Sequence, residues 1–214
     1  MAVMTRLALF GPPGADTADV ADHLAVRLGL LRISMREAAQ SATRAGSELG
    51  DQLRRFMDAE HSPPDELVAA LILRRLGEPD AAGGFVFWAS DAKALPLVVR
   101  SLAPLEIQVI ELVLADAEAT RRLTGRRLCR DCGKLWHIES TQTLDADVCD
   151  WCGGELFQRQ DDAPATVARR LSAYRERSSP VLEYYRAADR LISVDATCPA
   201  EHIAADLTRR IEQR

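Results

Sequence analysis

Residues 7–15 read Leu7-Ala8-Leu9-Phe10-Gly11-Pro12-Pro13-Gly14-Ala15, and this stretch determines the fold class. A short apolar run ends in a glycine-proline loop, and Val20, Leu24 and Leu28 then recur on one helix face before Gly29. The order strand, tight loop, helix is typical of a phosphate-binding loop, in which backbone N–H groups and a helix N-terminus hold an anion. We expect Gly11 to Ala15 to form that loop.

Four more short apolar runs follow along the chain, at residues 28–33, 84–88, 107–114 and 191–194. Helical patterns separate them, most clearly at residues 65–76, 163–174 and 200–214. Apolar strands that alternate with helices are typical of a buried parallel sheet, so we predict an α/β fold with a five-stranded parallel sheet. Two stretches break the alternation, residues 35–64 and 125–162, and we interpret both as insertions at the carboxyl-end rim of that sheet.

Composition limits the classes of partner. The chain has 214 residues, is 47% hydrophobic and carries a formal net charge of −5, with acidic and basic residues interspersed. No apolar stretch approaches the roughly 20 residues of a membrane span, and the charge does not suit a broad nucleic-acid surface. We therefore expect a soluble, cytoplasmic monomer that contacts neither membrane nor nucleic acid, and in which local basic clusters could bind small anions.

Four of the five cysteines form two C-x-x-C pairs separated by sixteen residues: Cys129, Cys132, Cys149 and Cys152. Paired C-x-x-C motifs predict a closed tetrahedral zinc site, and four protein ligands leave no open position for catalysis. We therefore predict a structural zinc ion. His137 is an alternative ligand in place of one cysteine, and four ordinary buried thiols are the other alternative. Cys198 stands apart, and we expect it to be buried near the last strand.

Further motifs extend the pattern over nearly the whole chain: Pro64-Asp65-Glu66, Arg122-Leu-Thr-Gly-Arg126-Arg127, Cys149-Asp-Trp-Cys-Gly-Gly-Glu-Leu156, Gln158-Arg159-Gln-Asp-Asp162 and Thr166-Val-Ala-Arg-Arg170-Leu171. With the Gly11 loop, they give the chain a sequence that resembles the adenylate kinase family in its zinc-lidded bacterial form. The resemblance implies a P-loop NTPase-like three-layer sandwich. Its core would comprise residues 1–34, 65–121 and 171–214, with a helical NMP-binding insertion at 35–64 and a zinc-bearing lid at 122–170.

The resemblance also implies functional residues and ligands. The nucleotide would be ATP or ADP, bound with Mg²⁺ by the loop and by four arginines: Arg122, Arg126, Arg159 and Arg170. In an active enzyme, the last three would also stabilise the transferred phosphoryl group. By residue type alone, the same arginines would be surface or hinge residues paired with Asp161, Asp162 and Glu155.

The loop differs from the family at the positions that would bind the phosphates. In place of the family's Gly-Lys-Gly-Thr, this chain has Asp16-Thr17-Ala18-Asp19, so Thr17 replaces the phosphate-binding lysine. We expect the Asp16 carboxylate to cap the following helix. It would also repel a polyphosphate by about 1–4 kcal/mol at a few ångströms.

The acceptor side departs as well. The family's Asp-Gly-Phe-Pro-Arg loop appears as Trp88-Ala-Ser-Asp-Ala92, and its other acceptor residues become Gln40 and Pro96. Arg36 and Lys93 lie near enough in sequence to replace part of the lost charge. These changes argue against AMP as the normal substrate.

Two hypotheses follow. The first is a nucleotide-binding member of this fold with impaired catalysis and a regulatory or scaffolding role, which could involve a protein partner. The alternative is an active nucleoside-monophosphate or small-molecule kinase with a remodelled acceptor pocket, which the apolar residues Trp88 and Met35 favour. Turnover on a panel of acceptors would distinguish them.

Overall fold

The computed structural model describes residues 5–59, 61, 63–89, 98 and 107–213. Five parallel strands form the central sheet in the order β2-β3-β1-β4-β8. They are β1 (Arg6–Phe10), β2 (Leu31–Ser34), β3 (Phe85–Ala89), β4 (Gln108–Val113) and β8 (Leu191–Asp195). The predicted five-stranded parallel sheet is therefore confirmed, although β2 begins later than the apolar run at 28–33 because Gly29, with φ of 63°, ends the preceding helix.

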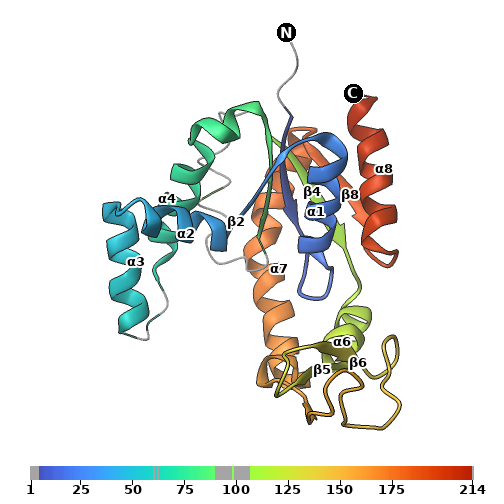
Figure 1. The fold of residues 1–214 in the computed structure, drawn as a ribbon. Helices are drawn as coiled ribbons and strands as arrows, with labels where there is room; N and C mark the ends of the chain where they lie inside the picture. The colour runs from blue at the N-terminus through green and yellow to red at the C-terminus, as the bar shows by residue number, and fades with distance from the viewer. Residues whose placement is uncertain (1–4, 60, 62, 90–97, 99–106, 214) are drawn as a thin grey trace.

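Helices cover both faces of this sheet, as Figure 1 shows. They are α1 (Thr17–Leu28), α2 (Met35–Arg44), α3 (Glu48–Asp58), α4 (Asp65–Leu76), η1 (Pro79–Gly83), α6 (Asp116–Thr124), η2 (Gln160–Asp162), α7 (Pro164–Ala187) and α8 (Ala200–Glu212). A second, antiparallel sheet has the order β6-β5-β7 and consists of β5 (Arg126–Cys129), β6 (Leu135–His137) and β7 (Leu156–Phe157). It lies below the central sheet in Figure 1, close to α6.

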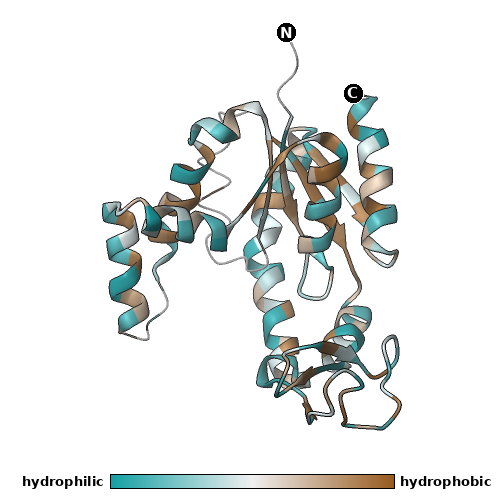
Figure 2. Ribbon diagram, in the orientation of Figure 1, coloured by the Kyte–Doolittle hydropathy of each residue, from teal (hydrophilic) through white to brown (hydrophobic). Residues whose placement is uncertain are grey.

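Alternate residues along the central strands pack into two hydrophobic cores, one on each face of the sheet. Leu7 and Leu9 pack with α1 and α8 on one face, whereas Ala8 and Phe10 pack with α4 and α7 on the other. Because successive strand side chains point to opposite faces, a strand covered on both sides is apolar throughout. Figure 2 shows this as hydrophobic strands in the middle of the fold and hydrophilic outer faces on the helices. The three-layer arrangement agrees with the sequence-based fold class.

Helices α2 and α3 project from the side of the sheet (Figure 1) and share a small core with α4 that contains Ala42, Leu53, Leu67 and Leu71. The hydroxyl of Ser34 caps α2 by accepting a hydrogen bond from the Glu37 N–H, and the Glu37 carboxylate accepts one from the Ser34 N–H. This reciprocal capping box fixes the point at which the chain leaves β2 for α2.

Two sequence-based expectations differ from the structure. The helix predicted at 163–174 continues to Ala187, because Val181, Leu182 and Tyr185 resume the buried face beyond the polar residues 175–179. Cys198 is exposed, because it lies in the turn between β8 and α8. The expectation of a buried Cys198 is wrong. Within the described ranges, no helix combines the length and the apolar character that crossing a membrane requires.

Gly84 provides a test of the packing around β3. Its φ is +115°, and a Cβ there would lie 2.5 Å from the Thr5 carbonyl oxygen and 2.9 Å from Leu30 Cδ2. We expect Gly84→Ala to lower the free energy of unfolding by about 2–3 kcal/mol, measured by urea denaturation, because both the backbone and the contact oppose a side chain. Gly83→Ala is the matched control, since a Cβ at Gly83 meets nothing within 4 Å. Equal stability of the two variants would contradict this packing.

Candidate functional site

A cavity of about 290 Å³ lies where β1 ends and α1 begins. It is lined by Gly11, Pro12, Pro13, Gly14, Asp16, Thr17, Ala18, Asp19, Trp88, Leu123, Arg126 and Arg170. Four of the five predicted loop residues therefore face it, and the fifth, Ala15, is buried in the core beneath. Cavities at the carboxyl ends of parallel strands are the usual ligand sites of open α/β sheets.

The loop retains a conformation suited to glycine at two positions. Gly14 has φ of +93°, and Asp16 has φ of 49° and ψ of 39°, which is the left-handed region. Aspartate is one of the few residues with a side chain that visits this region, at a cost that glycine avoids.

The Asp16 side chain makes no hydrogen bond to the α1 N-terminus, so the expectation that it caps the helix is wrong. A capping residue has extended backbone angles, whereas Asp16 is left-handed. Instead, Oδ1 accepts a hydrogen bond from Arg126 Nη2 at 3.4 Å, and Oδ2 lies 3.6 Å from Arg122 Nη1. Burial raises the pKa of Asp16, while the guanidinium groups of Arg126 and Arg122 oppose that rise. The carboxylate therefore faces the arginines across the loop.

Arg122 is held by protein groups on every side. Nε donates to Glu118 at 2.8 Å, Nη1 to the Gly14 carbonyl at 3.2 Å and Nη2 to the Thr197 carbonyl at 3.1 Å. Arg159 forms a two-bond pair with the buried carboxylate of Asp162, at 2.7 and 3.1 Å. Arg159 therefore has one of the carboxylate partners that the alternative from residue type named, whereas Arg122 is paired within the protein but with none of those three carboxylates.

Arg126 and Arg170 line the cavity itself. Arg126 pairs with Asp16, as described above, whereas Arg170 Nη1 donates to the backbone carbonyl of Asp161 at 3.1 Å. Glu155 pairs with neither, because it accepts from Arg130 at 2.9 Å. Among the described residues, Arg170 is thus the cavity cation that contacts a backbone carbonyl and not a carboxylate.

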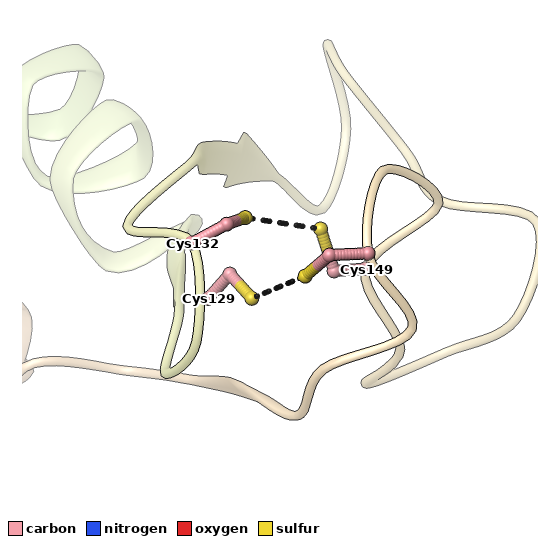
Figure 3. A group of neighbouring side chains, drawn as sticks. Cys129, Cys132 and Cys149 are labelled. Atoms are coloured by element: carbon pink, nitrogen blue, oxygen red, sulfur yellow. Dashed lines mark hydrogen bonds between the residues drawn. The ribbon is translucent and has the colours of Figure 1, made fainter.

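The four predicted metal ligands converge in the second sheet and its loops. Their Sγ atoms all lie within 4.8 Å of one another, with 3.4 Å between Cys129 and Cys152 and 3.7 Å between Cys132 and Cys149 (Figure 3). Thiolates bound to zinc at about 2.3 Å in a tetrahedron would be about 3.8 Å apart, whereas disulfide sulfurs would be about 2 Å apart. The donor set and its geometry therefore fit zinc.

His137 does not join that group. Its Nδ1 accepts hydrogen bonds from the backbone N–H groups of Glu139 and Ser140, at 3.1 and 3.3 Å. Its ring packs against Gly125 at the end of α6, where an added Cβ would lie 2.3 Å from Nε2. The alternative of a histidine ligand is therefore not supported by the structure.

The comparison with known families decides the relationship, because a family model described as adenylate kinase matches residues 9–190. The chain belongs to the adenylate kinase family. It is 41% identical to the adenylate kinase of Salinispora tropica over 203 residues, which covers 92% of this chain and 94% of that protein. It is 32% identical to the adenylate kinase of Archaeoglobus fulgidus over 213 residues (97% and 98%) and 37% identical to that of Acidothermus cellulolyticus over 206 residues (94% of each).

Within this adenylate kinase fold, the acceptor side is described only in part. Arg36 and Gln40 lie on α2, whereas Ala92, Lys93 and Pro96 lie outside the described residues. Trp88 lines the cavity at the end of β3, and its Nε1 is buried with no hydrogen-bond partner among the described residues. The sequence indicated an apolar group at this position, but not the buried donor. Sequence reasoning also missed the cavity residue Leu123 and the two carbonyl groups that hold Arg122.

Proposed function

We propose that this member of the adenylate kinase family binds nucleotide but transfers phosphoryl groups poorly, and that its role is regulatory or scaffolding. The single observation that carries this is the Asp16 carboxylate, which contacts Arg126 and Arg122 from within the phosphate loop. A carboxylate there competes with a nucleotide phosphate for the same guanidinium groups and repels it.

The charge of the cavity supports the same proposal. Of the residues that line it, Asp16 and Asp19 are acidic, Arg126 and Arg170 are basic, and Thr17 stands where the family has lysine. Phosphoryl transfer depends mainly on positioning and on neutralising the charge of the transferred group, and supplied arginines alone can contribute about 10³–10⁵ in rate. A lining with no net formal charge supplies little of that stabilisation.

We further propose a role for each of the remaining residues and segments. Backbone groups of Gly11 to Ala15, together with Arg126 and Arg170, would contact the nucleotide, and Arg122 and Arg159 would position the surrounding segments. Residues 122–170 would form the lid with its structural zinc, residues 35–64 the NMP-binding-like insertion, and the rest the core. Mg²⁺ would enter only with a nucleotide.

A coupled assay of ADP formation from Mg-ATP tests this proposal over a panel of nucleoside monophosphates and small-molecule acceptors. We expect turnover close to background for every acceptor, together with a melting shift on addition of nucleotide. Typical kinases turn over at about 1–100 per second. A rate in that range on any acceptor would instead establish the second candidate, an active kinase with a remodelled acceptor pocket, which Trp88 in the cavity wall favours.

A further inference from the structure

We propose that the four-cysteine cluster is a redox-responsive centre: a peroxide oxidises it to two disulfides that join the two C-x-x-C pairs, and this oxidation frees Arg126 from the phosphate loop. This chemistry goes beyond the proposed function, because it needs no nucleotide. Two of the cysteines, Cys129 and Cys149, are buried, and the other two, Cys132 and Cys152, are exposed. A small oxidant in solution can therefore reach one cysteine of each C-x-x-C pair.

Each exposed cysteine contacts a buried cysteine from the other C-x-x-C pair. Cys152 Sγ lies 3.4 Å from Cys129 Sγ, and Cys132 Sγ lies 3.7 Å from Cys149 Sγ. An exposed thiolate next to a second thiol is typical of redox-sensing cysteines, because the second thiol converts a sulfenic acid to a disulfide before it is oxidised further. The S–S bond is only about 2 Å long, so its formation pulls the sulfurs out of the tetrahedral arrangement that fits zinc.

The oxidation proceeds in two steps for each pair. In a zinc site all four cysteines are thiolates, the nucleophilic form. The exposed thiolate attacks one oxygen of hydrogen peroxide, the O–O bond breaks, and a sulfenic acid and a hydroxide ion form. The buried thiolate then attacks the sulfenic sulfur and displaces a second hydroxide, which leaves the disulfide. The two pairs together lose four electrons to two peroxide molecules, and four protons convert the hydroxides to water, so no thiolate remains to hold the metal.

Strand β5 connects this cluster to the nucleotide cavity. Cys129 is the last residue of β5 and Arg126 is the first, and the Arg126 guanidinium lies 3.4 Å from the Asp16 carboxylate of the phosphate loop. The core beneath β5 contains two of the cysteines and Leu156, with Trp136 packed against them. Because so small a core cannot order the strand without the metal, loss of the metal also releases Arg126 from Asp16.

Treatment of the zinc-loaded full chain with hydrogen peroxide tests the oxidation itself. A colorimetric zinc indicator should report release of one zinc ion per chain, and peptide mapping without reductant should find the linkages Cys129–Cys152 and Cys132–Cys149. Dimedone, which traps sulfenic acids, should label the exposed cysteine of a pair and not the buried one. A thiol reductant with added zinc should restore the starting state. Cys198→Ser is the matched control and should respond like the wild type, because Cys198 is exposed but lies outside the cluster.

Hydrogen exchange of the same samples tests the connection to the cavity. Oxidation should speed exchange of the amides of residues 11–18 by about 2- to 5-fold in the wild type, the range expected for loss of a partly exposed ion pair. In Arg126→Gln, which lacks that ion pair from the start, oxidation should leave their exchange unchanged.

Four results would each overturn the proposal: retention of zinc while Cys198 is oxidised, disulfides within a C-x-x-C pair, oxidation that a thiol does not reverse, and unchanged exchange of residues 11–18 after zinc release. None of these measurements involves a nucleotide, so the turnover assay tests the proposed function separately.

Discussion

Removal of the metal is expected to unfold the region between β5 and β7 while the central sheet stays folded. The apolar core of that region consists of Cys129, Cys149 and Leu156 with Trp136 packed against them, which is too little to stabilise a fold. Structural zinc in small domains supplies an apparent binding free energy of about 10–16 kcal/mol. A zinc ion held by the four thiolates would therefore provide most of the stability of this region, and we expect its removal to have a larger structural effect than the other changes considered.

Hydrogen exchange followed by mass spectrometry, before and after treatment with a chelator, measures this effect. Amides of β5, β6 and β7 should lose their protection, while those of β1 and β4 keep it. Cys149→Ser should reproduce the result without a chelator. Cys198→Ser is the matched control, since Cys198 is exposed and lies outside the cluster. Unchanged protection in β5 after chelation, or a purified protein that contains no zinc, would contradict the account of this centre.

Restoring glycine and lysine in the loop, as Asp16→Gly with Thr17→Lys, is expected to raise Mg-ATP affinity at least about 10-fold and to raise phosphoryl transfer above background. The glycine removes the carboxylate from Arg126 and suits the left-handed backbone at position 16. The lysine adds a cation at a position that lines the cavity. Titration calorimetry and the coupled assay measure the two effects.

The single variants show which change matters. Thr17→Lys alone should gain less than the double variant, because Asp16 remains beside the new cation and pairs with it. Asp19→Asn removes a different cavity carboxylate, whereas the carboxylate that contacts Arg126 and Arg122 is that of Asp16, so the effect of Asp19→Asn on affinity should be smaller than that of Asp16→Asn. A double variant with the affinity of the wild type would mean that the loop charge is not what limits nucleotide binding.

The sequence predicted the sheet well because its signals are local. In β1, Leu7 and Leu9 point to one face and Ala8 and Phe10 to the other, and all four are apolar. This is typical of a strand covered on both faces. The C-x-x-C pairs predicted the cysteine cluster because their spacing alone limits where the thiols can lie. The far end of α7 was missed because residues 175–179 are polar and interrupt the apolar face for more than one turn.

The site could be predicted only in part, because the role of a charged residue depends on distant partners. Residue type predicted that Asp16 caps the following helix. In the structure its backbone is left-handed, and its side chain instead accepts a hydrogen bond from Arg126, which is 110 positions away in the chain. Similarly, Arg122 and Arg170 look alike in the sequence. Arg122 is held by groups from α6, from the loop and from the turn after β8, and no local pattern predicts that combination.

The most direct test of the central claim is a calorimetric comparison of Mg-ATP binding to the wild type and to Asp16→Asn. Asparagine tolerates the left-handed backbone and differs from aspartate mainly in charge, so the fold should be unaffected. Two charges about 4 Å apart interact by about 1 kcal/mol in a water-like environment, and the Asp16 side chain is 42% exposed, so we predict affinity that is about 5- to 10-fold tighter for the variant. Equal or weaker binding to Asp16→Asn would show that the carboxylate does not compete with nucleotide phosphates for Arg126 and Arg122.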